Sequence, residues 1–415
     1  MNKIPQDVVR IKELVSQHEQ WRSRTLNLIA SENAFSPHLS EALQNDWLGR
    51  YADFTGRDLD DRRYRGTRYM TEIEKIVEGM AQRVFKADYI ELRAIAGHIA
   101  GAAVIMALCE PGDILMELSR GSGGHREASK FVIPALLDLN IYWLPFDGQR
   151  YNVDVHQVAD LFKETQPRLV ILGSSNFLFP HPVQQIRQVI DEVSPDTILV
   201  YDSSHVLGLV AGGQFQDPLR EGADIVFSST HKTFPGPQGG IIFTNREDLI
   251  ELVSEAIYPG LITNHHPFRM PGMAVALAEM EAFGETYATQ IISNAQALGT
   301  ALEGNGVSCV NVDRVYSCSH TILVKTAEIG PASDLALKLE EADIICTSSG
   351  LPEEQGGEGI RLGVQELTHH GMDEDDMTQV ATLLADVMLD RRSLAAVAKD
   401  VHALVEAYAT VKFTW

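Results

Sequence analysis

A lysine lies in a tract of small polar residues where an α/β protein usually carries apolar ones. Residues 227–240 read FSSTHKTFPGPQGG, between the apolar runs ADIVF and GGIIFT. A buried lysine cation is costly, so a lysine between two buried strands is exposed, paired or used chemically. Lys232 could be an amine with a lowered pKa that forms a Schiff base with an aldehyde. It could equally be an ordinary lysine in a Gly- and Pro-rich turn, and the tract alone does not decide.

Two more residues would suit pyridine chemistry beside such a lysine. Asp202 ends the run TILVYD, 30 residues before Lys232. A carboxylate there could hold a pyridine nitrogen protonated, which makes pyridoxal phosphate an electron sink. His205 would steady the same cofactor or cap a helix.

Three further positions could bind the remaining groups of a phosphorylated cofactor and an amino acid. Gly97 opens the helical stretch HIAGAAVIMALC, and a helix start binds phosphate through its N–H groups. His125, in SGGHREAS, could stack on a ring or lie on a surface loop. Arg361, in GIRLG, could grip a carboxylate bidentately or form a surface ion pair.

The elements that position these residues alternate along the chain. Short runs rich in Ile, Val and Leu predict buried strands of a mostly parallel sheet with helices on both faces. These runs are DILMEL, IYWLPF, RLVILG, TILVYD, ADIVFS and GGIIFT. The pattern also predicts a helix over residues 6–24 and a long helix over 271–300. We therefore expect an N-terminal helical arm (1–30), a large α/β domain (31–275) and a smaller α+β domain (276–415).

Composition narrows the function. The 415 residues include 34 Lys+Arg and 57 Asp+Glu, a net charge of −23, which disfavours a nucleic-acid partner. The widely spaced Cys109, Cys309, Cys318 and Cys346 indicate reduced thiols, with no disulfide frame and no metal site. No signal peptide or membrane-spanning run is recognisable, so we expect a cytoplasmic protein.

Two motifs carry a resemblance to a known family. THKTFPGPQGG and YDSSHVLGLVAGG resemble the lysine and Asp-x-x-His motifs of the serine hydroxymethyltransferase family of fold-type I pyridoxal-phosphate enzymes. The similarity extends from LIASEN at residue 28 to GIRLG at residue 363. It implies a large domain with a seven-stranded, mostly parallel sheet, and a smaller C-terminal α+β domain. It also implies pyridoxal 5'-phosphate as cofactor, an amino-acid substrate with an aldehyde, and a homodimer with shared active sites or a tetramer.

The resemblance assigns roles to individual residues. The catalytic set that it implies is Lys232, which forms the internal aldimine, with His125, Asp53 and His231. Cofactor contacts are assigned to Asp202, His205, His125, Ala96, Gly97, His98, Ser175, Gly260 and, toward the neighbouring subunit's phosphate, Tyr51. Substrate contacts are assigned to Ser31, Arg361, Tyr64 and Arg65.

The chain departs from the family where folate binds. The family's Tyr-Ala-Glu-Gly and Arg-Tyr-Tyr-Gly-Gly are here YADF at 51–54 and RYRGT at 63–67. Asp53 is one methylene shorter than the glutamate that handles protons and folate. Arg65 replaces a neutral phenol with a permanent cation. Other replacements are Ala96-Gly97-His98 for the Ser-Gly-Ser phosphate cup, Arg126 for an apolar wall, Gln238 for arginine and Ser349 for asparagine.

These departures favour a folate-independent reaction. We expect an aldol-type enzyme that cleaves a threonine- or serine-like β-hydroxy-α-amino acid through a glycyl quinonoid, as an aldolase or a transaldolase. Arg65 and Arg126 would meet an anionic partner or pair with Asp58, Asp60 and Asp61. The alternatives are a serine or α-methylserine hydroxymethyltransferase that uses tetrahydrofolate, an aminotransferase or racemase on the same scaffold, and an interaction protein without cofactor.

Overall fold

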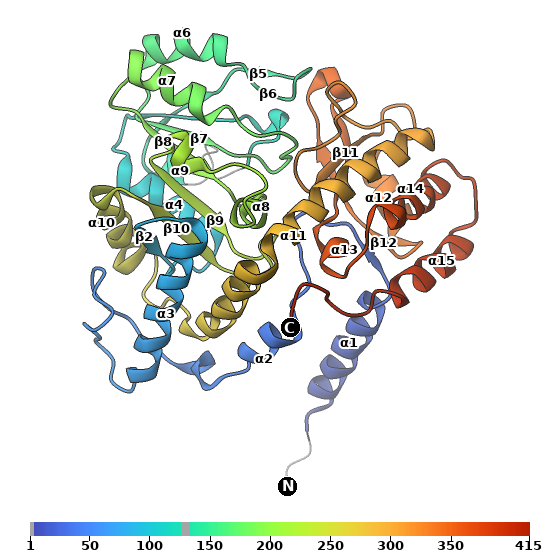
Figure 1. Cartoon of the computed structure of the whole chain (residues 1–415), viewed down its shortest axis with the longest axis horizontal. Coiled ribbons are helices and arrows are strands. Elements are labelled where there is room, and N and C mark those ends of the chain that lie inside the picture. Colours follow the sequence, from blue (N-terminus) through green and yellow to red (C-terminus); the bar gives the residue numbers. More distant parts are fainter. Residues whose placement is uncertain (1–3, 126–132) are drawn as a thin grey trace.

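A seven-stranded sheet forms the centre of the larger half of the molecule (Figure 1). The computed structural model describes residues 4–125 and 133–415. The strand order is β2-β10-β9-β8-β7-β3-β4, and only β10 runs antiparallel to its neighbours. The strands are β2 (Tyr89–Glu91), β3 (Ile114–Glu117), β4 (Asn140–Trp143), β7 (Leu169–Leu172), β8 (Ile198–Asp202), β9 (Ile225–Ser229) and β10 (Gly240–Thr244). The predicted mostly parallel sheet is confirmed.

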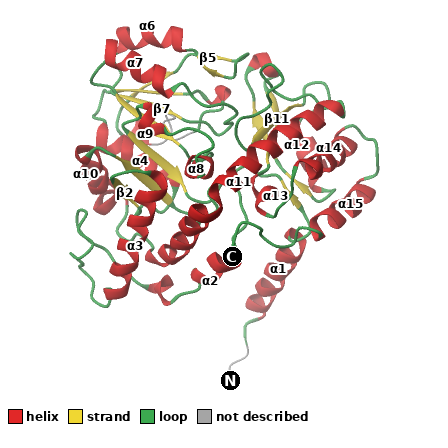
Figure 2. Ribbon diagram, in the orientation of Figure 1, coloured by secondary structure: helices red, strands yellow, loops and turns green. Residues whose placement is uncertain are grey.

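The central strands are apolar because helices cover both sheet faces (Figure 2). Every residue of β7, β8, β9 and β10 is buried. Alternate side chains belong to two separate cores: Val170 and Val226 face one core, and Ile171 and Ile225 face the other. The second core contains α4 (Gly97–Leu108) and α10 (Glu247–Glu255), and the first contains helices that include α3 (Arg68–Phe85), α6 (Val155–Thr165) and α7 (Val183–Val193).

A 35-residue helix, α11 (Met270–Gly304), crosses the molecule and leads to the C-terminal part (Figure 1). It confirms the long helix expected over 271–300. Beyond it lies the antiparallel sheet β11 (Thr321–Lys325), β14 (Glu358–Gly363) and β13 (Thr347–Gly350). The packed helices there are α12 (Ala332–Glu340), α13 (Gln365–His369), α14 (Glu374–Met388) and α15 (Leu394–Glu406).

The N-terminal segment is attached to this C-terminal part. Strand β1 (Leu26–Asn27) pairs with β12 (Ile344–Ile345), whereas α1 (Gln6–Arg22) buries none of its side chains and projects from the body (Figure 1). The three-domain division remains a prediction. The shorter elements are α2 (Pro37–Ala42), α5 (Ile133–Leu136), α8 (Leu207–Ala211), α9 (Pro218–Glu221), β5 (Phe146–Asp147), β6 (Asn152–Val153), η1 (Asp46–Gly49), η2 (Arg120–Ser122), η3 (Ala256–Leu261), η4 (Pro267–Arg269) and η5 (Glu353–Gln355).

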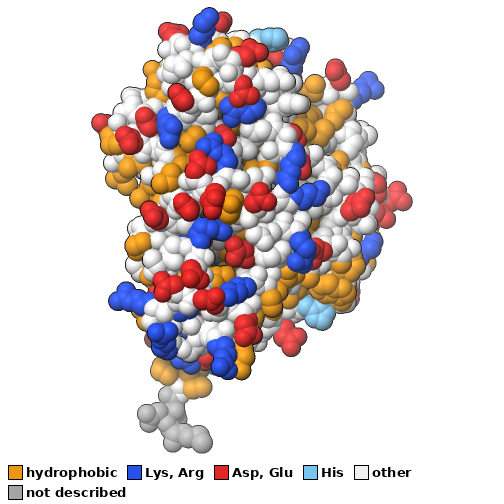
Figure 3. All heavy atoms as spheres, turned by 60° about the vertical axis from the view of Figure 1, so that its left-hand side comes forward, with side chains coloured by type: hydrophobic (Ala, Val, Ile, Leu, Met, Phe, Trp, Pro, Cys, Tyr) orange, Lys and Arg blue, Asp and Glu red, His pale blue; other side chains and the backbone are white. Residues whose placement is uncertain are grey.

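The surface charges and the state of the cysteines are as the composition led us to expect. The face in Figure 3 carries acidic and basic side chains interspersed, with no extended patch of one sign. All four cysteines are free, Cys109 and Cys309 buried and the other two partly buried. Within residues 4–125 and 133–415, none of the helices combines the length and apolarity needed to cross a bilayer.

The buried histidine His181 makes the free energy of unfolding depend on pH. Burial lowers the pKa of His181 to about 3, against an ordinary value near 6.5. Below about pH 6.5 the unfolded chain binds a proton that the folded chain does not, so the free energy of unfolding falls as pH falls toward 3. We expect His181→Gln to remove about 2 kcal/mol of the loss between pH 6.5 and 4.5, measured by urea unfolding at both values.

The control is His156→Gln, at an exposed position of α6. It should keep the pH dependence of the unaltered chain. The same loss in the His181 and His156 variants would contradict the assignment.

Candidate active site

Asp202 and Lys232, singled out in the sequence, lie at the carboxyl ends of two neighbouring strands of the large sheet. The carboxyl ends of β3, β7, β8 and β9 are neighbours there, which is where ligands bind in open α/β sheets. Asp202 is the last residue of β8 and is paired in register with Phe227 of β9, while Lys232 lies in the loop after β9. The structure therefore brings the carboxylate and the lysine to adjacent strand ends.

The lysine loop is held by hydrogen bonds from two other segments. Thr233 donates its hydroxyl to the carbonyl of His205 at 2.9 Å and accepts from the Gly208 amide at 3.1 Å. The Asn33 side-chain amide donates to the carbonyl of Lys232 at 2.7 Å. The LIASEN segment and the Asp-x-x-His segment thus fix the backbone on either side of the lysine.

A pair of buried histidines connects these segments. The rings of His205 and His320 are stacked with centroids 5.5 Å apart, and His205 Nδ1 lies 3.4 Å from His320 Nε2. His320 Nε2 is also 3.1 Å from the carbonyl oxygen of Ala30, which can only accept, so this nitrogen carries a hydrogen.

The electrostatics place three candidate residues and His320 around His205. Burial lowers the pKa of His205 well below its usual range, and the charges of Lys232, Arg361, His320 and His125 lower it further. Burial, with Lys232 beside it, lowers the pKa of His231 to about 4. Both histidines are therefore neutral at pH 7, the state in which a ring nitrogen can accept or share a proton.

Arg361 borders a polar cavity of about 220 Å³. Arg361 lies within β14, not merely beside a strand, and its Nη1 donates to the Ser175 carbonyl at 2.8 Å. The cavity is lined by Arg120, Gly123, Gly124, His125, Ser175, Asn176, Ser348, Ser349, Gly350 and Arg361. His125, Ser175 and Arg361, predicted separately, therefore share one cavity.

The start of α4 is pressed against the end of β9. Ala96 precedes the helix, and a Cβ on Gly97 would lie 2.8 Å from Cβ and 2.9 Å from N of Ser229. The ring of His98 lies 6.4 Å from that of His125. A helix start near His125 fits a phosphate, because the first N–H groups of a helix have no partner within it.

Glycine is therefore required at this helix start. We expect Gly97→Ala to push α4 away from β9 at a cost of about 1–3 kcal/mol. That corresponds to roughly 5- to 150-fold weaker binding of pyridoxal phosphate, measured by fluorescence titration of the cofactor-free protein.

Gly79→Ala in α3 is the matched control, because nothing lies within 4 Å of the added Cβ. It should bind the cofactor like the unaltered chain. Equal affinities in all three proteins would show that the close approach of α4 to β9 has no part in binding.

The donors and acceptors at this edge fit pyridoxal phosphate. Three buried polar atoms around Lys232 have no hydrogen-bond partner in the described chain: Ser229 Oγ, His231 Nδ1 and Arg361 Nε. Unsatisfied buried groups are uncommon and are typical of a binding site. A phosphorylated pyridine aldehyde with an attached amino acid supplies a phosphate for α4, a ring nitrogen for Asp202 and a carboxylate for Arg361.

Tyr51, Tyr64 and Arg65 lie together, but not in the cavity beside Arg361. They line a separate surface cavity of about 570 Å³, with the Tyr51 and Tyr64 rings 5.2 Å apart. Tyr51 and Tyr64 are 48% and 40% exposed, as expected of side chains that reach a neighbouring subunit. Among the described residues Arg65 forms no ion pair, because Asp60 pairs with Lys75 instead.

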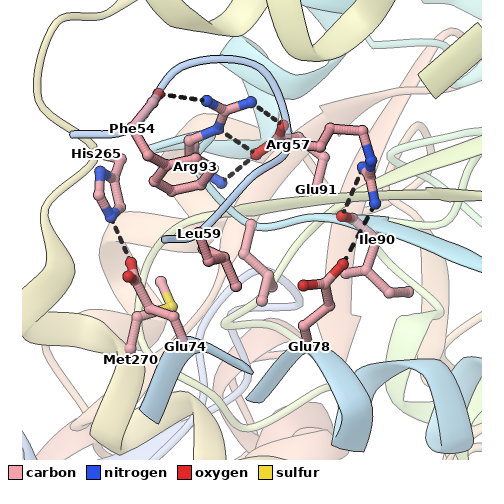
Figure 4. Close-up of a pocket in the computed structure, with 11 residues that line it drawn as sticks. Phe54, Arg57, Leu59, Glu74, Glu78, Ile90, Glu91, Arg93, His265 and Met270 are labelled. Carbon is pink, nitrogen blue, oxygen red and sulfur yellow. Dashed lines mark hydrogen bonds and ion pairs between the residues drawn. The ribbon is translucent and has the colours of Figure 1, made fainter. Parts of the chain in front are cut away.

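Asp53 points into its own subunit. It is 3% exposed, and its Oδ1 lies 3.8 Å from Nδ1 of His265, whose Nε2 is 2.5 Å from Glu74 Oε1 (Figure 4). Burial lowers the pKa of His265, but Asp53 and Glu74 outweigh it and raise that pKa. The guanidiniums of Arg62 and Arg93 stack on the Phe54 ring at 4.8 and 4.4 Å. This cluster anchors the loop that presents Tyr51 and Tyr64.

The structure places Ser31 and Gly260, two further residues predicted for the site, in different surroundings, and a third residue, Arg126, is not described. Ser31 follows Ala30, whose carbonyl accepts from His320, so it lies close to the histidine pair. Gly260 lies exposed in η3, outside both cavities. Arg126 is outside the described residues.

The sequence analysis missed several residues that support the site. His320, Thr233, Asn176 and Arg120 were not singled out, because one sequence gives no signal that separates them from ordinary polar residues. His320 had one available signal, a histidine immediately before the apolar strand run TILVK.

Comparison with known proteins agrees with this geometry. Residues 4–384 match the family model described as serine hydroxymethyltransferase. The serine hydroxymethyltransferase of Pyrococcus abyssi is 40% identical over 98% of this chain and 96% of the relative, and that of Methanocella arvoryzae is 42% identical over the same shares.

A solved structure matches the whole fold. The L-threonine transaldolase from Pseudomonas fluorescens, in its internal aldimine state, superposes with a TM-score of 0.92 and 30% identity over 99% of this chain and 94% of that one. These matches establish that the chain belongs to the serine hydroxymethyltransferase family, fold-type I enzymes whose cofactor is pyridoxal phosphate.

Proposed function

We propose that this chain is a folate-independent aldol-type enzyme. It cleaves the Cα–Cβ bond of a threonine- or serine-like β-hydroxy-α-amino acid. The remaining glycyl unit then either takes up a proton or forms a new bond to a second aldehyde. The observation that carries the proposal is the lining of the cavity beside Arg361. Among the lining residues that belong to the described parts of the chain, 4–125 and 133–415, none has an apolar side chain. A flat, aromatic pterin is bound by apolar or stacking walls, and this lining offers hydroxyls and cations instead.

The retained residues suit the amino-acid half of the reaction. Arg361 binds the substrate α-carboxylate, assisted by Ser31, and its attachment to the Ser175 carbonyl fixes the guanidinium plane. Lys232 supplies the amine that holds the cofactor, and Asp202 holds the ring nitrogen protonated. When bound, pyridoxal phosphate supplies the electron sink for the pair left at Cα.

We assign the proton transfers of the reaction to side chains that line the cavity beside Arg361. His125 lines it and is the base that we assign to the β-hydroxyl of the substrate, a role worth about 10²–10⁴-fold. His231, with a pKa of about 4, is uncharged at pH 7 and is a weak base, so we place it beside Lys232, where one ring nitrogen can accept a hydrogen bond. Asp53 is enclosed with His265 and Glu74, and we assign it to loop anchoring.

A homodimer would complete the site. The exposed cavity of Tyr51, Tyr64 and Arg65 lacks Lys232, Asp202 and Arg361, and it would complement these residues in a neighbouring subunit. Light scattering of the purified protein should give twice the chain mass or more.

The purified holoenzyme tests the proposal directly. L-threonine alone should yield glycine and acetaldehyde, and adding an aldehyde should yield a new β-hydroxy amino acid detected by mass. Tetrahydrofolate with L-serine should give no methylene-tetrahydrofolate. Robust formation of that product would support a hydroxymethyltransferase, and accumulation of pyridoxamine phosphate would support an aminotransferase.

A further inference from the structure

The cavity beside Arg361 contains a second arginine. Arg120 is the first residue of η2, in the loop after β3, and its exposed side chain lines the same cavity of about 220 Å³. Opposite it are Ser348 and Ser349 of β13, from the C-terminal sheet. Arg120 therefore stands where a co-substrate would lie next to the bound amino acid.

The loop that carries Arg120 is fixed to the end of β7. The carbonyl of Gly123 accepts from the Ser174 hydroxyl and from the Ser175 amide, each at 2.8 Å. Gly123 has φ +86°, and a Cβ there would lie 2.8 Å from Ser174 Oγ and 3.0 Å from Asn176 Cβ. Ser119 closes the other side of the turn, because its hydroxyl accepts from the Ser122 amide at 3.2 Å. The backbone at Arg120 is thus held in place.

The charges in the cavity do not balance once the amino acid is bound. The described lining includes two arginines and no carboxylate. The α-carboxylate of the substrate neutralises Arg361 only, and Arg120 forms no ion pair with any described residue. The Ser349 hydroxyl also lines the cavity, where it donates to Asn176 Oδ1 at 3.0 Å. A ligand with its own acceptor-rich negative group complements this arrangement.

We propose that the acceptor aldehyde carries a carboxylate or a phosphate, which Arg120 binds. The inference rests on the proposed function and names the substrate class of the same site. In the exchange, the β-hydroxyl of threonine loses its proton, the Cα–Cβ bond breaks and acetaldehyde leaves. The electron pair at Cα forms a new bond to the carbonyl carbon of the acceptor, and the carbonyl oxygen takes up a proton. Nothing is oxidised or reduced.

The first test compares matched aldehydes with L-threonine as glycyl donor. Succinic semialdehyde is paired with butanal, and glycolaldehyde phosphate with glycolaldehyde, so that each pair differs by one anionic group. A hydrogen-bonded ion pair with Arg120 should raise kcat/KM by about 10- to 100-fold within at least one pair. The pair that shows the larger ratio distinguishes a carboxylate from a phosphate.

The second test removes the cation. Arg120→Gln should lower kcat/KM for the anionic aldehyde about 10- to 100-fold and change that of its neutral counterpart by less than about threefold. Arg120→Lys keeps the charge but not the bidentate geometry, so it should fall between the two. Arg150→Gln is the control, because Arg150 is exposed and lies outside the cavity.

A binding measurement distinguishes a failure of the anion site at Arg120 from a failure of the proposed aldol function. Calorimetric titration of the holoenzyme, saturated with glycine so that Arg361 is occupied, with butyrate and with methyl phosphate should show binding that Arg120→Gln abolishes. If neutral aldehydes exchange well and the anionic ones gain nothing, the anion site is overturned and the aldol function stands. If no aldehyde exchanges, the proposed function fails, and the calorimetry alone decides whether Arg120 binds an anion.

Discussion

Replacing Lys232 by alanine is expected to lower kcat for threonine cleavage by about 10³-fold or more and to leave a protein that loses its cofactor on gel filtration. The loop around Lys232 is tied to Asn33 and to the His205 segment through backbone groups and Thr233, none of which the substitution removes. The fold should therefore persist while the amine that holds the cofactor is absent. Stopped assays with absorbance spectra of the same samples measure both effects.

Lys163→Ala is the matched control, since Lys163 lies exposed on α6 of the same half of the molecule. It should keep full activity and a covalently bound cofactor. An alanine variant at position 232 that still carries the cofactor after borohydride reduction and denaturation would show that another amine holds it.

Much of the fold was predictable because it depends on burial. β7, β8 and β9 are buried at every residue, so their apolar runs stand out in the sequence. Strand β13 was missed for the converse reason. It reads TSSG, and its partly exposed residues carry no apolar signal.

Some residues of the candidate site could also be predicted from the sequence, and others could not. Lys232 and Asp202 could be predicted because charged groups at strand ends of an α/β sheet have few structural uses, and Arg361 because the stretch that ends at GIRLG resembles the family. Asp53 shows where one sequence stops being informative. Its Oδ1 lies 3.8 Å from Nδ1 of His265, which is 212 residues away in the chain and is itself paired with Glu74, and no local pattern predicts that contact.

Arg120 and His320 illustrate the same limit. Arg120 becomes a candidate only when β3 and β13 are seen to border one cavity, and His320 only when its ring is seen to lie between Ala30 and His205. Both depend on which loops meet, and that is set by the order of the strands.

The second large effect is expected for Asp202→Asn, which removes a charge and keeps the shape. Asp202 is 7% exposed, and its Oδ1 accepts from the Ser204 amide at 2.9 Å, a bond that the asparagine oxygen can keep. What is lost is the negative charge opposite the protonated ring nitrogen. Breaking one side of a buried charge pair costs about 3–5 kcal/mol, so kcat/KM for L-threonine should fall by about 10²–10⁴-fold.

The control must be an equally buried carboxylate outside the site. Asp386 of α14 is also 7% exposed and pairs with Arg392. Asp386→Asn is expected to lose some stability and to keep kcat/KM within about threefold, because its charge lies in another part of the fold. If the Asp202 and Asp386 variants had equal kcat/KM values, the carboxylate at the end of β8 would have no electrostatic role toward the ring, and the electron-sink chemistry would need another acid.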